Sequence, residues 1–172
     1  FVIALFDNMY GGGNFTKRMI TVFYEELLKW AIEDEQIFVI CKEKKPDNIA
    51  RLTSIGYLVS EAIQTNRFIR LDNVLGRFPS DASHGADMAI GIGISSAVDE
   101  AVIAGTRGIH CDIPGDKTHK YYQWGHEKIV FDDIGRLIVA LKQYKNDQES
   151  NPGLGDWSSH IDELDPFRDG RS

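Results

Sequence analysis

The chain has 172 residues, of which 42% are hydrophobic and 26% are charged, and its formal net charge at pH 7 is -7. This size and apolar content suffice for one domain with a buried core and are small for two. The negative net charge argues against nucleic acid as the main partner, because phosphate backbones are bound by clustered Lys and Arg side chains. No apolar stretch approaches the length of a transmembrane helix, which predicts a soluble protein.

The chain begins at Phe1 rather than at a methionine, and we therefore expect it to be one part of a longer protein. The apolar run that starts at Phe1 ends at Asp7, which makes it too short for a membrane span or a secretion signal. Two cysteines, Cys41 and Cys111, stand inside apolar runs without the spacing of a metal or redox motif. We expect both to be reduced core thiols of a cytoplasmic protein.

Short apolar runs recur along the chain and predict β-strands. They are almost continuously apolar rather than alternating, which is typical of parallel strands that are covered on both faces. The predicted strands span Val2–Phe6, Gln36–Cys41, Arg67–Leu71, Asp87–Ile92, Gly108–Asp112 and Lys128–Phe131.

Helical spacing of apolar residues occupies the stretches between these runs. The predicted helices span Thr16–Ile32, Asn48–Ile63 with an interruption at Gly56, Ser96–Ala104, and Asp133–Tyr144 after the last strand. Strands that alternate with helices predict the α/β class, with a Rossmann-like, doubly wound parallel sheet of about six strands and helices on both faces.

The composition changes after Asn146. Residues 147–172 begin with turn chemistry at Asn151–Gly155 and continue as a polar stretch with isolated large apolar side chains. We therefore divide the chain into a Rossmann-like domain, residues 1–146, and a carboxy-terminal arm, residues 147–172, that packs against another surface.

The first candidate site is the glycine-rich segment that follows the first predicted strand. Gly12, Gly13 and Asn14 lead into a helix, where backbone N–H groups and the helix N-terminus attract phosphate. The spacing matches neither a Walker loop nor the dinucleotide fingerprint. The alternative is a loop that needs glycine only for positive φ angles.

The second candidate site follows the second predicted strand. Lys42 and Lys44 stand where the carboxyl end of that strand meets the ligand side of a doubly wound sheet. Ammonium groups there would neutralise a diphosphate or a substrate carboxylate. A solvated charged loop explains the same residues equally well.

The most informative segment follows the fourth predicted strand. Gly93 marks a turn, and Ser95 and Ser96 begin a short helix, so that two hydroxyls and the first amides of the helix meet the end of the strand. Glu100, one turn further, is placed to accept hydrogen bonds from ribose hydroxyls. The alternative is an ordinary serine N-cap, with Asp99 and Glu100 favouring the helix dipole.

The remaining polar and aromatic residues allow weaker inferences. Tyr121–Trp124 lies in an aromatic-rich loop that either stacks a base or sugar ring or packs on itself. The histidines are scattered without the spacing of metal ligands, and we expect no metal in this chain. The sequence contains no GxSxG elbow, which disfavours a hydrolase that uses a serine nucleophile.

The segment around Ser95 resembles the carboxy-terminal, donor-binding domain of GT-B glycosyltransferases, and it is most similar to bacterial capsule and surface-polysaccharide biosynthesis proteins. The similarity lies in the serine pair Ser95–Ser96, in Glu100–Ala101, in Gly105, and in the spacing to Ile109 and Asp112. Residues 165–170, Asp-Pro-Phe-Arg-Asp-Gly, also resemble the closing segment of such proteins.

The resemblance implies that Ser95 and Ser96 hold the phosphate of a nucleotide-sugar donor and that Glu100 binds the ribose. It implies no cofactor beyond the donor substrate, an amino-terminal partner domain that completes the enzyme, and a cytoplasmic location at the inner face of the membrane through the full-length protein. The segment Lys42–Pro46 lacks the histidine that many relatives carry after the second strand, and the paired-glutamate motif of retaining enzymes is not evident.

Two alternatives remain open. A sugar-nucleotide 2-epimerase shares this architecture and donor site, although the first-strand loop lacks the His and acids that would favour it. A non-catalytic α/β regulatory or binding module would keep the fold without the site.

Overall fold

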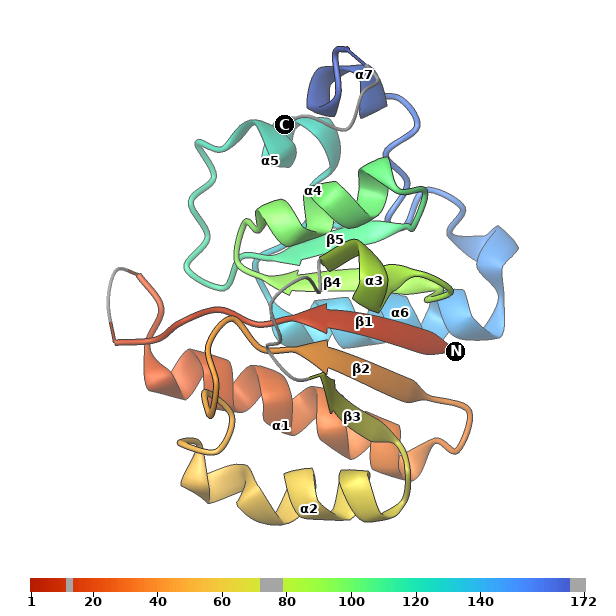
Figure 1. Cartoon of the computed structure of the whole chain (residues 1–172). Helices are drawn as coiled ribbons and strands as arrows, with labels where there is room; N and C mark the ends of the chain where they lie inside the picture. Colours follow the sequence, from red (N-terminus) through yellow and green to blue (C-terminus); the bar gives the residue numbers. More distant parts are fainter. Residues whose placement is uncertain (12–13, 72–78, 168–172) are drawn as a thin grey trace.

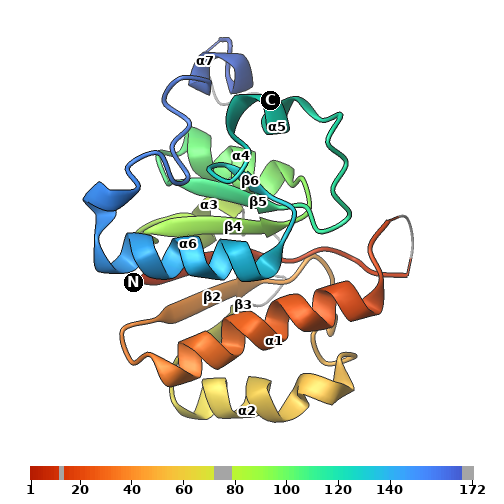
Figure 2. The same ribbon diagram turned by 180° about the vertical axis from the view of Figure 1, so that it is seen from behind.

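The computed structural model describes residues 1–11, 14–71 and 79–167. Its centre is a six-stranded sheet with the strand order β3-β2-β1-β4-β5-β6, in which every pairing is parallel. Figure 1 shows the strands β1 to β5, and β6 is labelled in Figure 2. The strands are β1 (Val2–Phe6), β2 (Phe38–Lys42), β3 (Phe68–Leu71), β4 (Met88–Ile92), β5 (Gly108–Cys111) and β6 (Val130–Phe131). The predicted fold class is therefore confirmed, and each predicted strand matches an observed one to within two residues at either end.

Helices cover both faces of the sheet because side chains alternate along each strand. In β1, Ile3 and Leu5 enter one core cluster, whereas Ala4 and Phe6 enter the other. The first face is covered by α1 (Lys17–Glu33) and α6 (Ile134–Asn146), and α2 (Gly56–Gln64) packs against α1 (Figure 2). The second face carries α3 (Pro79–Ser83) and α4 (Ser96–Ile103), which contact each other (Figure 1). No helix in the described part of the chain is both long enough and apolar enough to cross a membrane.

The helix predicted over Asn48–Ile63 is wrong in its first part. A 3₁₀ turn (Thr53–Ile55) precedes α2, which begins only at Gly56. In the segment before the 3₁₀ turn, two residues donate hydrogen bonds to carboxylates. Asn48 Nδ2 donates to Asp7 Oδ2 at 2.6 Å, and the Ile49 amide donates to Glu43 Oε2 at 2.9 Å. The Ile49 amide is thereby bound to a side chain rather than to a backbone carbonyl of a helix.

The described part of the carboxy-terminal arm packs on the domain formed by residues 1–146. The Trp157 indole donates to the Gly108 carbonyl at 2.8 Å, the Gly108 amide donates to Gly155, and Leu154 is fully buried. A 3₁₀ turn (Gln148–Ser150) follows α6, and α7 (Ile161–Leu164) lies against α4 (Figure 1). The arm thus covers the outer part of the second face of the sheet.

Candidate ligand-binding site

A cavity of about 310 Å³ opens beyond the carboxyl ends of β1, β2 and β4. It is lined by residues 6–8, 42–44 and 94–97, together with Pro79 at the start of α3. From β1 the chain proceeds through β2 to β3 on one side of the sheet, and from β4 it proceeds through β5 to β6 on the other side. The strand order therefore reverses between β1 and β4. Ligands of doubly wound sheets bind at this point.

The N-terminus of α4 forms one wall of this cavity. Ser96 and Ala97 are the first two residues of the helix, and both line the cavity. The amides at the first positions of a helix have no acceptor within the helix, and the helix dipole adds positive potential there. This wall is therefore suited to an anion.

Ser95 does not act as the side-chain cap that the alternative interpretation expects. It occupies the N-cap position of α4, but its hydroxyl makes no capping hydrogen bond within the described structure. Its backbone amide donates instead to His110 Nδ1, at 3.1 Å. The Ser95 amide therefore has an internal acceptor, and the amides of Ser96 and Ala97 are the ones left for a ligand.

Gly93 has a structural reason to be glycine. Its φ of +81° lies in the left-handed region, and a Cβ atom there would lie 2.6 Å from the Phe15 ring and 3.0 Å from Asn8 Nδ2. The segment that follows β1 therefore packs directly on the turn that follows β4. Gly93 is not among the described residues that line the cavity.

Two lysines lie on the opposite wall. Lys42 ends β2 and Lys44 follows it, and both line the cavity. The Lys44 ammonium lies 3.4 Å from Asn8 Oδ1, and its backbone amide donates to Asp7 Oδ1. The structure thus brings both predicted lysines together with Ser95 and Ser96 around one cavity.

The two acids of the cavity are bound by internal partners. Glu43 is buried and accepts a hydrogen bond from Arg70 Nε at 2.6 Å, in addition to the Ile49 amide. Asp7 is also buried, and burial raises the pKa of its carboxyl to about 6 although Asn48 and the Lys44 amide lower it. Both acids of the cavity therefore accept hydrogen bonds from groups of the protein itself.

Two further predicted site residues, Glu100 and Asn14, lie outside this cavity. Glu100, in the second turn of α4, does not line it; burial and the neighbouring Asp99 raise the pKa of Glu100, while Lys42 lowers it. Asn14 is exposed and also does not line the cavity. Gly12 and Gly13 lie outside the described residues.

Asp7, Asn8 and His110 were not among the predicted site residues. The position of Asp7 and Asn8 directly after the central strand could have identified them, because such positions face the ligand side of the sheet. His110 could have been noticed as a polar ring in the middle of a buried strand, which needs a polar partner.

The aromatic segment before β6 packs on the arm. It contains the helix α5 (Lys120–Gly125), which was not predicted, and Tyr121 is buried with its ring centroid 4.8 Å from that of Trp157. Trp124 stacks on His160 at 4.4 Å, with an interplanar angle of 3°. These contacts match the alternative in which the segment packs within the protein.

The two cysteines are buried, unpaired thiols, as predicted, and burial raises the pKa of each. The described residues contain no group of three or more His, Cys, Asp or Glu side chains placed to hold a metal ion.

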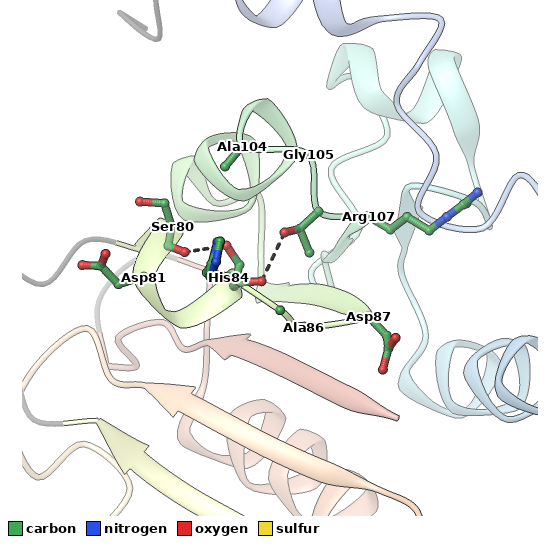
Figure 3. Close-up of a pocket in the computed structure, with 11 residues that line it drawn as sticks. Ser80, Asp81, His84, Ala86, Asp87, Ala104, Gly105 and Arg107 are labelled. Carbon is green, nitrogen blue, oxygen red and sulfur yellow. Dashed lines mark hydrogen bonds between the residues drawn. The ribbon is translucent and has the colours of Figure 1, made fainter.

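A larger cavity, of about 470 Å³, lies at the opposite, amino-terminal edge of the sheet (Figure 3). It is lined by residues 80–81, 83–87 and 104–107, which belong to α3, to the end of α4 and to the turns before β4 and β5. Arg107 extends from it toward the arm (Figure 3) and donates to the carbonyls of Pro152 and Leu154.

No known protein-family model matches the chain, and no curated protein sequence matches it either.

Proposed function

We propose that this chain is the donor-binding domain of a GT-B-type glycosyltransferase that moves a sugar from a nucleotide-sugar to a polysaccharide or glycolipid acceptor. The observation that carries the proposal is the meeting of Lys42 and Lys44 with the N-terminus of α4 around the cavity at the strand-order reversal. Ammonium groups on one wall and helix amides on the other provide complementary donors for phosphate oxygens.

The same arrangement suits the chemistry of sugar transfer. Negative charge grows on the leaving phosphate as the glycosidic bond breaks, and fixed donors at that position stabilise the transition state. Lys42, Lys44 and the amides of Ser96 and Ala97 would act on the leaving group. The group that activates the acceptor hydroxyl would come from an amino-terminal domain that closes over the cavity, at the inner face of the membrane.

The first experiment measures binding of UDP, GDP and CMP to the full chain by calorimetry and by the shift in melting temperature. We expect one of them to bind and to raise the melting temperature. Ser96→Asp puts a carboxylate at the N-terminus of α4 and should weaken that binding at least roughly tenfold, because like charges repel at close range. Ser80→Asp, which puts the same charge into the cavity at the amino edge, should leave the affinity unchanged.

Absence of binding by all three nucleotides would favour the non-catalytic module. Turnover of a nucleotide-sugar into its 2-epimer, without any transfer by the full-length protein, would favour the epimerase. Equal effects of Ser96→Asp and Ser80→Asp would show that the nucleotide binds elsewhere.

A further inference from the structure

His110 is a polar ring in the middle of β5 and is fully buried. Its ring stacks on Tyr121 with centroids 4.9 Å apart, and it meets Trp157 edge-on at 5.5 Å. A polar ring in such a layer is costly unless its nitrogens find partners. Its two nitrogens face the beginning of α4, at the Ser95 amide and the Asp99 carboxylate.

The hydrogen bond that Nδ1 of His110 accepts defines the tautomer of the ring. Nδ1 accepts the Ser95 amide at 3.1 Å, so it carries no proton, and the proton of the neutral imidazole is on Nε2. Nε2 lies 3.3 Å from Asp99 Oδ1, but the two are not aligned as a hydrogen bond, and Nε2 has no other partner among the described atoms. The Tyr121 hydroxyl donates to the same Asp99 oxygen at 3.0 Å.

The beginning of α4 is also held from the neighbouring strand. At Gly91 of β4, a Cβ atom would lie 2.7 Å from Val98 Cγ2 and 2.9 Å from Ser95 Cβ, so the helix sits directly on the strand backbone. Ser95 is therefore fixed from β4 by packing and from β5 by the hydrogen bond to His110. The amides of Ser96 and Ala97 follow this fixed residue at the wall of the cavity.

We propose that His110 is a positioning residue for the anion site: by accepting the Ser95 amide, it fixes the turn after β4 so that the Ser96 and Ala97 amides meet a phosphate group in the cavity. The inference rests on the proposed function, because it assigns those amides to the phosphate of the donor. His110 is fully buried and acts through Ser95 rather than on the ligand.

Inorganic pyrophosphate is the probe, with its dissociation constant measured from amide shifts of the ¹⁵N-labelled full chain. His110→Phe keeps a flat ring but loses the acceptor, and we expect binding to weaken roughly five- to tenfold, which corresponds to one hydrogen bond. His110→Asn restores an acceptor near the position of Nδ1 and should bind within about twofold of wild type. His119→Phe is the matched control, because His119 Nδ1 also accepts a backbone amide, that of Tyr121 in α5, and this variant should bind like wild type.

A second test uses the wild type alone and measures the NMR signals of the imidazole nitrogens of His110. It should show His110 with an unprotonated Nδ1 and a protonated Nε2. A proton on Nδ1 would overturn the inference even if His110→Phe failed to fold.

Wild-type affinity in folded His110→Phe would also overturn it, while leaving nucleotide binding and the proposed function intact. If wild type binds neither pyrophosphate nor any of the three nucleotides, the proposed function is wrong, and this inference is wrong with it.

Discussion

The two edges of the sheet both carry a cavity, and the larger one is the poorer candidate for an anion. At the amino edge, about 470 Å³ opens beside the carboxyl ends of α3 and α4, where helix dipoles are negative. Its cation, Arg107, is bound to two carbonyls of the arm. At the carboxyl edge, about 310 Å³ opens beside the N-terminus of α4 and two lysines. Helix direction and internal hydrogen bonds therefore separate the two cavities better than volume does.

The two edges also carry glycines with nearly the same backbone conformation and different surroundings. Gly93 has φ +81° and would place a Cβ atom 2.6 Å from Phe15, whereas Gly85 at the amino edge has φ +80° and nothing within 4 Å. We expect Gly93→Ala to lower the free energy of unfolding by about 3 kcal/mol, from strain and overpacking together, and Gly85→Ala by about 1 kcal/mol from strain alone. Urea unfolding measures both. Equal losses of unfolding free energy in the two variants would contradict the close packing of Phe15 and Asn8 on Gly93.

The buried carboxyl of Asp7 should make the carboxyl edge sensitive to pH. Its pKa is raised to about 6 chiefly by burial, so the folded state holds this proton more tightly than the unfolded state does. Stability contributed by protonated Asp7 is therefore present at low pH and is lost as the pH rises through about 6. The stability of wild type relative to Asp7→Asn should fall by about 2 kcal/mol between about pH 4.5 and pH 7.

Asp116 provides the opposite sign. Hydrogen bonds from Thr118 lower the pKa of its exposed carboxyl, so wild type should gain stability relative to Asp116→Asn as the pH rises through the acid range. Urea unfolding at several pH values tests both variants. A flat difference for Asp7→Asn would contradict the burial of that carboxyl.

Replacing a cation at the carboxyl edge should weaken nucleotide binding, whereas replacing one at the amino edge should lower only the stability of the fold. We expect Lys44→Ala to weaken binding of the preferred nucleotide roughly fivefold, since it removes one exposed charged donor. Arg107→Ala should leave that affinity unchanged and lower the melting temperature, because the arm loses two hydrogen bonds. Lys45→Ala, next to the cavity but outside its lining, is the control for charge alone. Calorimetry and thermal unfolding measure these effects, and a binding defect in Arg107→Ala would reverse the assignment of the edges.

Much of the fold could be predicted because buried parallel strands have continuous runs of apolar residues. All six predicted strands match observed strands to within two residues at either end. The location of Lys42, Lys44, Ser95 and Ser96 around one cavity also follows from topology, since the ends of parallel strands meet at one edge.

The contacts that depend on tertiary structure could not be predicted in this way. The Trp157 indole donates a hydrogen bond to the carbonyl of Gly108 in β5, 49 residues away. The Ser95 amide donates to His110, which is also in β5 and lies 15 residues away. The turns after β2 escaped prediction for the same reason, because the carboxylate of Asp7 that binds Asn48 is 41 residues distant.

The most direct test of the donor-site assignment is a map of backbone amide shifts in the full chain on titration with UDP, GDP and CMP. We expect saturable shifts at Lys42–Lys44 and Ser95–Ala97 with one of these nucleotides, and none at Ser80–Asp87 or Arg107. Shifts confined to the amino edge, or no saturable shift with any of the three, would show that the cavity at the carboxyl edge does not bind the donor.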